Sequence, residues 1–331
     1  MINRELIRLK LVQVLYSYHQ RGLHNPDVAE KELLLSLDKA YDLYNYMLLL
    51  LVEVSRMSVR MYEMRQSRSR RLSDGEKWSR KFIENRFILQ LETNRQLRDY
   101  CDEHALSWAD HEDFVRTLYN NIEESEYYKN YMSTADSTYE EDRELWRLIY
   151  RNLIVGNDEL TELLEDQNIY WNDDKFIVDT FVLKTINRFK AESTSTQSLM
   201  PEYKSSTDRD FATKLLRHTL IGQEYHNELI AANARGWEFH RIAVMDRIIL
   251  QLGLAEITTF PSIPVSVSIN EYVEIAKSYS TPKSGKYVNA TLDHISKQLL
   301  EEKKLVKTAP QTPPKESGED VVESDVEADV E

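Results

Sequence analysis

The scarcity of helix-breaking residues limits the fold of this chain more than any other feature of its sequence. Eight glycines and eight prolines are spread over 331 residues, while leucine, glutamate and arginine recur every three or four positions through most of the chain. This spacing is typical of amphipathic helices, whereas strands alternate every second residue and are bounded by turn residues. We therefore expect an all-α protein.

The composition argues against membrane and secreted proteins. The strongest apolar run, residues 47–52, is far shorter than the roughly 18 residues of a spanning helix. The residues after Met1 lack the apolar core of a signal peptide. The single cysteine, Cys101, has no partner for an internal disulfide, which fits a reducing compartment. We expect a cytoplasmic protein that does not enter a membrane.

The sequence contains none of the common motifs for catalysis or cofactor binding. Its glycines are too far apart for the phosphate-binding loops of Rossmann and P-loop proteins. His104 and His111 lie among acidic residues but lack the spacing of metal ligands on a helix, and no serine occupies a G-x-S-x-G turn. We expect no enzymatic activity, no cofactor and no metal site.

Four regions are predicted along the chain. Residues 1–20 form a first helix, and residues 21–207 form a long helical insertion that ends in a linker rich in serine and threonine. Residues 208–305 form a compact helical domain. Residues 306–331, with three prolines and eight acidic residues, form a disordered tail. The first helix has a single apolar stripe, which consists of Ile7, Leu11, Val14, Leu15 and Tyr18.

A faint internal repeat links the insertion to the compact domain. At an offset of 66 residues, one set of five residues matches another: Arg151, Gly156, Glu162, Leu163 and Trp171 align with Arg217, Gly222, Glu228, Leu229 and Trp237. Two amphipathic helical pairs share such matches through their common period, so a degenerate repeat and a coincidence of periodicity both stay open.

Both ends of the chain resemble one known family. The first helix reads RELIRLKLVQVLYSY from Arg4, and three later blocks, residues 241–250, 264–277 and 284–293, follow in a matching order and spacing. Together they resemble the bacterial transcription antitermination factors of the NusB family. The resemblance covers residues 1–20 and 208–300, and the insertion between them is missing from compact members of the family.

The resemblance implies both a fold and a role. It implies an all-α NusB-like helical bundle with no enzymatic activity. It also implies binding of boxA-type single-stranded RNA together with NusE, a ribosomal protein of the small subunit. Such a factor would act within an RNA polymerase antitermination complex and support transcription of ribosomal RNA by opposing termination.

Basic residues at both ends of the match fit RNA binding. Single-stranded RNA is held by cations along its backbone and by aromatic rings on which bases stack. Arg4 and Arg8 lie one helical turn apart, and Lys10 flanks them. The alternative interpretation is that these residues form an ordinary solvated edge of a core helix.

The second predicted RNA contact lies near the C-terminal end of the match. Pro282 suits the first position of a helix, whose free N–H groups would then face a phosphate next to Lys283 and Lys286. Tyr287 corresponds to the aromatic residue of a lysine–aromatic pair in the family, and it either stacks on a base or belongs to the core.

Two residues are predicted to receive the protein partner. The family match places Tyr16 and Asp246 at the surface that binds NusE, and an acidic edge suits a basic ribosomal protein. Asp246 lies within an apolar helix, so a local ion pair with Arg247 is the alternative.

Two other functions compete with RNA-binding antitermination. One is a helical scaffold that binds only proteins, with the insertion as its docking surface. The other is an RNA methyltransferase, because NusB-like domains precede such enzymes. The sequence argues against a methyltransferase, since Cys101 is not part of a catalytic motif and only a tail follows the family match.

Overall fold

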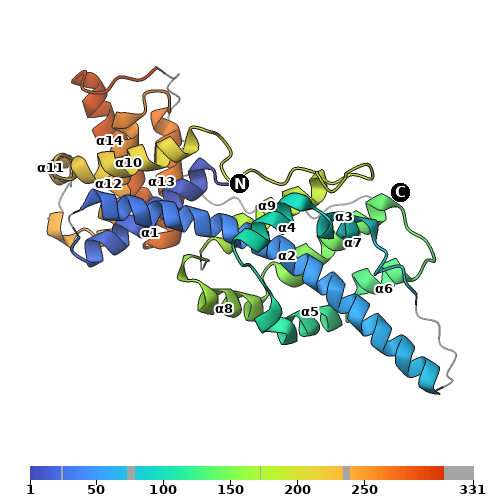
Figure 1. Ribbon diagram of the computed structural model, residues 1–331. Coiled ribbons are helices and arrows are strands. Elements are labelled where there is room, and N and C mark those ends of the chain that lie inside the picture. The colour runs from blue at the N-terminus through green and yellow to red at the C-terminus, as the bar shows by residue number, and fades with distance from the viewer. Residues whose placement is uncertain (24, 73–78, 172, 234–238, 309–331) are drawn as a thin grey trace, which may run out of the picture. The chain divides into compact units, whose positions relative to one another are not determined.

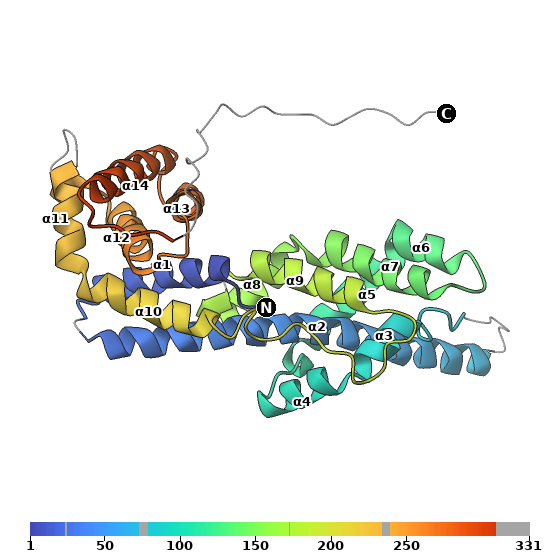
Figure 2. The ribbon, with the colours of Figure 1, turned by 90° about the horizontal axis from the view of Figure 1, so that it is seen from above.

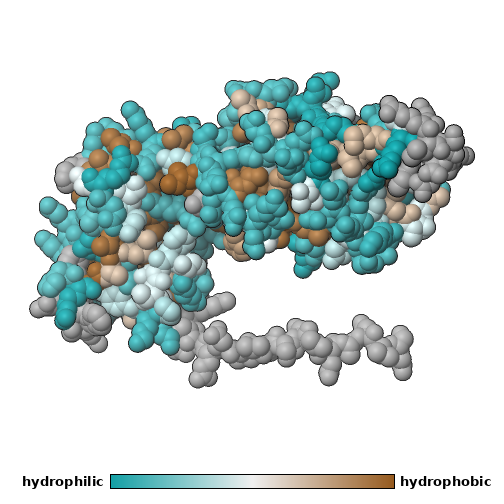
Figure 3. Space-filling view, turned by 90° about the horizontal axis from the view of Figure 1, so that it is seen from below, coloured by the Kyte–Doolittle hydropathy of each residue, from teal (hydrophilic) through white to brown (hydrophobic). Residues whose placement is uncertain are grey.

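The computed structural model confirms the all-α prediction for the residues that it describes, which are all except 24, 73–78, 172, 234–238 and 309–331 (Figure 1). The described residues contain no β-strand, only an isolated bridge between Ile2 and Tyr203. None of their helices has the length and apolar character needed to cross a membrane, and hydrophilic residues cover most of the face in Figure 3.

The chain divides into two compact units. Unit 1 consists of Met1–Leu6 and Leu34–Asp208, and unit 2 consists of Ile7–Leu33 and Arg209–Glu331. This division by packing differs from the predicted boundary at residue 20, because the long helix α2 (Pro26–Leu72) runs uninterrupted from one unit into the other. A helix that continues without a break offers no linker at which the sequence could mark a boundary.

Unit 1 is built from α2 and seven shorter helices that gather around it (Figures 1 and 2). The shorter helices are α3 (Arg86–Glu92), α4 (Arg95–Glu103), α5 (Glu112–Glu124), α6 (Glu126–Met132), α7 (Tyr139–Ile149), α8 (Asp158–Gln167) and α9 (Lys175–Arg188). A π-turn (Tyr150–Ile154) extends α7, and short 3-10 turns cover Ala109–His111 and Ile169–Trp171.

Aromatic side chains attach the shorter elements of unit 1 to α2. Tyr44 lies fully buried, with its hydroxyl 2.7 Å from that of Thr185 on α9. The indole N–H groups of Trp108 and Trp171 donate to backbone carbonyls of α2 at 3.0 and 2.8 Å. Because these two buried indoles each find an acceptor on α2, their rings fill the core without leaving their own N–H groups unsatisfied.

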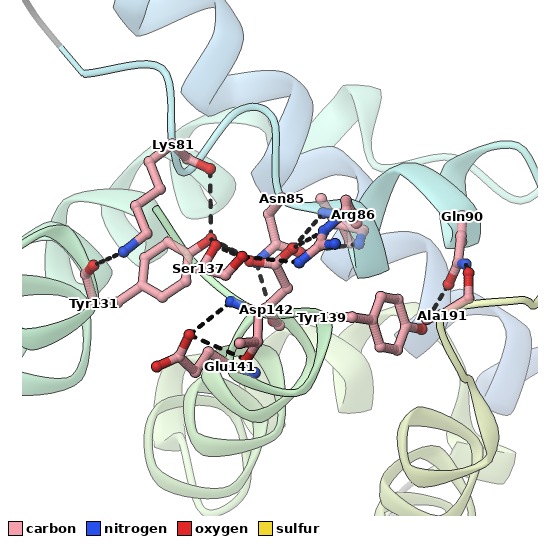
Figure 4. A network of polar contacts seen from close by, with 12 residues as sticks. Lys81, Asn85, Arg86, Gln90, Tyr131, Ser137, Tyr139, Glu141, Asp142 and Ala191 are labelled. Atoms are coloured by element: carbon pink, nitrogen blue, oxygen red, sulfur yellow. Dashed lines mark hydrogen bonds and ion pairs between the residues drawn. The ribbon is translucent and has the colours of Figure 1, made fainter. Parts of the chain in front are cut away.

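A buried carboxylate joins α3, α6 and α7 (Figure 4). Asp142 is 2 % exposed and accepts hydrogen bonds from the hydroxyls of Tyr131 and Ser137 and from the backbone and side chain of Arg86. Burial alone would raise the pKa of Asp142, but these hydrogen bonds outweigh it and hold the pKa below its usual value. The ionised carboxylate therefore acts as the common acceptor that fixes these three helices together.

Unit 2 is built from the remaining helices. They are α1 (Arg4–Gln20), whose residues from Ile7 onward belong here, α10 (Asp208–Ile221), α11 (Gln223–Asn233), α12 (Val244–Thr259), α13 (Val265–Tyr279) and α14 (Ser284–Glu301), with a 3-10 turn at Phe239–Arg241. The helices α12, α13 and α14 pack against one another, and α11 packs against α12 and α14. At Gly253 a Cβ atom would come within 2.7 Å of Leu292, so the missing side chain allows α14 to approach α12 closely.

A buried ion pair joins the first helix to this bundle. Arg8 is 4 % exposed, and its Nε and Nη2 donate to the two carboxylate oxygens of Glu256 on α12 at 2.8 and 2.9 Å. Glu256 is fully buried and also accepts from Ser268 and Tyr272 on α13 at 2.7 and 3.0 Å. Burial opposes the charge of Arg8, but the bonds to Glu256 prevail and raise the pKa of the guanidinium. Both carboxylate oxygens of Glu256 thus accept two hydrogen bonds each within one cluster.

Two residues beyond the predicted domain end at residue 305 contact the connection between α12 and α13. The Lys307 ammonium donates to the carbonyls of Phe260 and Ile263 at 3.0 and 2.9 Å, and the backbone N–H of Thr308 donates to the carbonyl of Pro261. Lys307 and Thr308 therefore contact the α12–α13 connection, where Lys307 satisfies carbonyls at a helix end. The predicted disorder of the rest of the tail, residues 309–331, lies outside the described residues.

One pair of the internal repeat differs in backbone conformation. Gly156 has a φ of +72°, whereas Gly222 is not left-handed and lies between α10 and α11. Trp237, the last residue of the repeat, lies outside the described part of the chain. The repeat stays a prediction from sequence.

Replacing Arg8 with methionine should destabilise the protein strongly. Glu256 would be left fully buried without its cationic partner, and breaking a buried pair in this way costs about 3–5 kcal/mol of unfolding free energy. Urea unfolding followed by circular dichroism measures the loss. The matched control is Arg21→Met, because Arg21 forms an exposed ion pair with Glu32 at 3.1 Å, and such pairs contribute about 1 kcal/mol or less. Equal losses for both variants would contradict the assigned role of Arg8.

Unit 2 should also lose stability in mild acid because of His226. This residue is 4 % exposed, and burial, together with nearby His218, lowers its pKa from 6.5 to about 4. The unfolded chain takes up a proton near pH 6.5 while the folded chain stays neutral, so stability falls as the pH drops from 6.5 toward 4. We expect His226→Gln to remove about 2 kcal/mol of the loss between pH 7 and pH 5. The exposed His294→Gln is the control, and an unchanged pH dependence in His226→Gln would refute the assignment.

Candidate nucleic-acid interface

The candidate RNA site lies where the loop after α13 enters α14. The helix begins at Ser284, two residues later than the predicted start at Pro282, because Pro282 and Lys283 form a turn. Ser284 holds this turn together: its hydroxyl donates to the Asp246 carboxylate at 3.0 Å and accepts the N–H of Thr281 at 3.2 Å. The hydrogen bond to Asp246 therefore anchors the loop to α12.

Lys283 and Lys286 are both exposed at this helix start. No ion pair or hydrogen bond to either ammonium group occurs among the described residues. The N-terminal end of a helix carries a partial positive charge that adds to theirs. An approaching anion would therefore meet two uncompensated cations and the positive end of α14.

The sequence allowed Tyr287 either to stack on a base or to belong to the core, and its environment combines features of both. The residue is half-buried, and its buried part includes the hydroxyl, whose desolvation raises the pKa of the phenol. The exposed part of the residue therefore includes ring rather than hydroxyl. A partly exposed ring next to Lys286 can offer an apolar surface to a base, while its hydroxyl stays in the core.

The structure adds a third lysine that the sequence analysis missed. A Cβ atom at Gly285 would lie 3.0 Å from Cγ of Lys277, so the Lys277 side chain runs across the first turn of α14. Its ammonium pairs with Glu274 at 2.9 Å, but both side chains are exposed and such a pair is weak. Lys277 belongs to α13, and only the close packing at Gly285 could have pointed to it. We call Lys277, Lys283 and Lys286 the α14 lysine patch.

Asp246, the acid predicted to face the protein partner, is largely buried. It is 8 % exposed in the first turn of α12, where its Oδ2 receives the Ser284 hydroxyl. The guanidinium of Arg247 contacts the imidazole of His19. Asp246 instead positions the loop that carries Lys283. Tyr16, the other predicted partner residue, is 39 % exposed on α1 and remains accessible.

The prediction that Arg8 and Lys10 face solvent is wrong. Arg8 is held by Glu256 and Glu271, and Lys10 is 1 % exposed. The helix α1 buries side chains around most of its circumference, so a position off the apolar stripe is still covered. Only Arg4 keeps substantial exposure, at 42 % of its side chain, and it pairs with Asp208 at 3.5 Å in unit 1.

The chain resembles known proteins over its C-terminal third. Residues 178–297 match the sequence model of the NusB family. The transcription antitermination protein NusB of Salinibacter ruber is 42 % identical over 109 residues, which cover 33 % of this chain and 68 % of the relative. The protein of the same name from Dictyoglomus turgidum is 37 % identical over 95 residues, covering 29 % of this chain and 66 % of the relative.

Among solved structures, the chain is similar to a crystal form of T. maritima NusB. The sequences are 25 % identical, the match covers 49 % of this chain and 97 % of that chain, and the TM-score is 0.29. The relative from Chloroherpeton thalassium, 39 % identical, is spanned over 40 % of its length. From its match to the Salinibacter relative, the chain belongs to the NusB family.

Proposed function

We propose that this protein is a transcription antitermination factor that binds single-stranded, boxA-type RNA through the α14 lysine patch. The observation that carries the proposal is the exposure of Lys283 and Lys286, free of ion pairs among the described residues, beside the partly exposed ring of Tyr287. Cations next to an aromatic ring are the arrangement that unpaired RNA requires. The relatives are named for transcription antitermination, which supports the same role.

The charge of the protein favours a weak and selective interaction. The chain carries a net charge of -14, so a strand without additional contacts is repelled at long range. A patch of three lysines that contacts three phosphates gives a salt dependence with a slope near about -2. The remaining affinity would come from a partner protein, for which we propose a small-subunit ribosomal protein of the NusE type.

The sequence predicted that α1 contacts RNA through Arg4, Arg8 and Lys10, but in this proposal most of α1 has a structural role. Arg8 and Lys10 are buried in the bundle, so their side chains are not accessible to RNA. Tyr16 remains the proposed partner contact on α1 because its side chain is accessible. Asp246 acts on the RNA site indirectly, through its bond to Ser284. Arg4 stays a proposed RNA contact of unit 1.

The proposed role is that of an adaptor without catalysis. It needs a surface for RNA and a surface for protein, and neither requires a nucleophile or a cofactor. Among the described residues no group of histidine, cysteine and carboxylate side chains is arranged to hold a metal ion. Cys101 is buried in α4, and burial raises the pKa of its thiol to about 12, which is the opposite of what a reactive thiolate needs.

Removing two lysines of the patch should weaken RNA binding. We expect Lys283→Ala with Lys286→Ala to reduce the affinity for a boxA-type oligoribonucleotide about tenfold at low salt. The slope of log affinity against log salt should fall in magnitude by about 0.7 for each lysine removed. Fluorescence anisotropy with the full chain, with and without the ribosomal partner, measures both quantities.

The matched control removes a lysine from the same helix, further along. Lys297 is exposed and already paired with Asp293 at 2.7 Å, so Lys297→Ala should leave RNA affinity nearly unchanged. If the double variant and the wild-type protein bind the RNA equally, the α14 lysine patch is not the RNA site. In that case a helical scaffold that binds only proteins becomes the better description.

A further inference from the structure

The insertion contains a cavity that the proposed function does not use. Its volume is about 410 Å³, within the range of small-molecule sites. The walls come from α2, α5, α6 and the segment before α3, and all of the lining residues belong to unit 1. The lining residues lie outside residues 178–297, the part of the chain that matches the NusB family.

Four of the ten lining residues are aromatic. Phe82 and Tyr119 are almost fully buried, with ring centroids 6.4 Å apart, and they make a fixed floor. Tyr128 lies edge-on to Phe82, at 5.1 Å between centroids. Tyr62 and Tyr128 are half-buried, so part of each ring is open to the cavity and to an entering group. Flat, partly exposed rings above an apolar floor suit a planar guest.

The charges in the wall cancel one another. Arg65 donates to both carboxylate oxygens of Glu123 at 2.5 and 2.6 Å, and the Tyr119 hydroxyl donates to the same carboxylate at 2.7 Å. Burial alone would raise the pKa of Glu123, but these bonds lower it, so the pair stays ionised and neutral overall. Glu123 is the one acidic residue in the lining and Arg65 compensates it, so the cavity offers no net negative charge to a cation. Its chemistry favours an uncharged ring that also forms hydrogen bonds.

Two arginines, Arg68 and Arg80, lie near the cavity on the outside of unit 1. Arg80 follows Ser79 of the cavity wall, and its guanidinium lies 5.6 Å from the ring centroid of Tyr62. It pairs with Glu84 at 2.6 Å, but both side chains are more than half exposed, so the pair is weak. Arg68 is exposed on α2, one turn beyond Arg65. A ligand with a neutral aromatic part and an anionic part would match this distribution.

We propose that this cavity binds an unpaired nucleotide, with its base between Tyr62 and Tyr128 and its phosphate at Arg80. Stacking on tyrosine and attraction to arginine are the two interactions by which proteins hold single-stranded nucleic acid. The Arg65–Glu123 pair then offers hydrogen bonds to the edge of the base. That the nucleotide belongs to an RNA strand, and is not a free nucleotide, rests on the proposed function.

The test compares variants that remove a ring with variants that keep it. Binding of the full chain to single-stranded octamers of adenylate and of uridylate, and to AMP and UMP, is measured by fluorescence anisotropy and by calorimetry. We expect Tyr62→Leu and Tyr128→Leu each to weaken octamer binding about tenfold. Tyr62→Phe and Tyr128→Phe keep the stacking surface and should bind within about twofold of wild type. Both tyrosines are half-buried, and circular dichroism confirms that each variant is folded.

Crosslinking gives a readout that does not depend on these substitutions. An octamer that carries 4-thiouridine is crosslinked to the wild-type protein by light, and the modified peptide is identified by mass spectrometry. A crosslink within residues 58–83 or 119–132 supports the proposal. Crosslinks confined to other peptides, combined with leucine variants that bind like wild type, overturn it.

The outcomes separate this inference from the proposed function. If the leucine variants weaken octamer binding and Lys283→Ala with Lys286→Ala does not, the cavity binds RNA and the α14 lysine patch does not. If only the lysine variant weakens binding, the cavity proposal fails and the proposed function stands. If AMP or UMP binds in a tyrosine-dependent way while octamer binding is unaffected, the nucleotide is a free one and the RNA part of the inference fails.

Discussion

The buried pair of Arg8 and Glu256 is the interaction on which unit 2 depends. Moving two charges out of water is unfavourable, and the protein offsets it by a bidentate contact and by hydroxyl donors from Ser268 and Tyr272. A buried pair of this kind adds little net stability over an apolar core, but a mismatched partner is strongly disfavoured. The pair thereby specifies that the first helix packs against α12 and α13, although the whole insertion separates them in the sequence.

The sequence predicted the helices well and the solvent exposure of charged residues poorly. The all-α class and the apolar stripe of α1 follow from periodicity, which records which side chains must avoid water. Arg8 lies off that stripe, and its burial depends on Glu256, an acid within an apolar helix far along the chain. A buried acid and a distant buried base are each unexplained alone. Their pairing becomes visible only when both are placed in the fold.

The two regions predicted to bind RNA, the start of α1 and the start of α14, differ in how far local sequence decides the exposure of their cations. Lys283 and Lys286 lie at a helix start after a proline turn, where local sequence largely decides exposure, and their accessibility agrees with expectation. Lys277 escaped notice because it reaches the site from another helix across Gly285. The cavity in the insertion was out of reach of sequence analysis, since its rings come from α2, α5, α6 and a connecting segment. Such a site is defined by tertiary packing and has no linear motif.

The sequence distance between Arg8 and Glu256 has a consequence for how this protein is made. The two residues are 248 positions apart, and chains are synthesised at about 5–20 residues per second. During translation the opening helix therefore waits on the order of tens of seconds for its partner to leave the ribosome. Throughout that interval Arg8 lacks the acid that neutralises it, and the helices α12, α13 and α14 of unit 2 have not yet been synthesised. Unit 1 can fold first. The helix α1, which is synthesised before the others, then joins the bundle of unit 2, which is completed last.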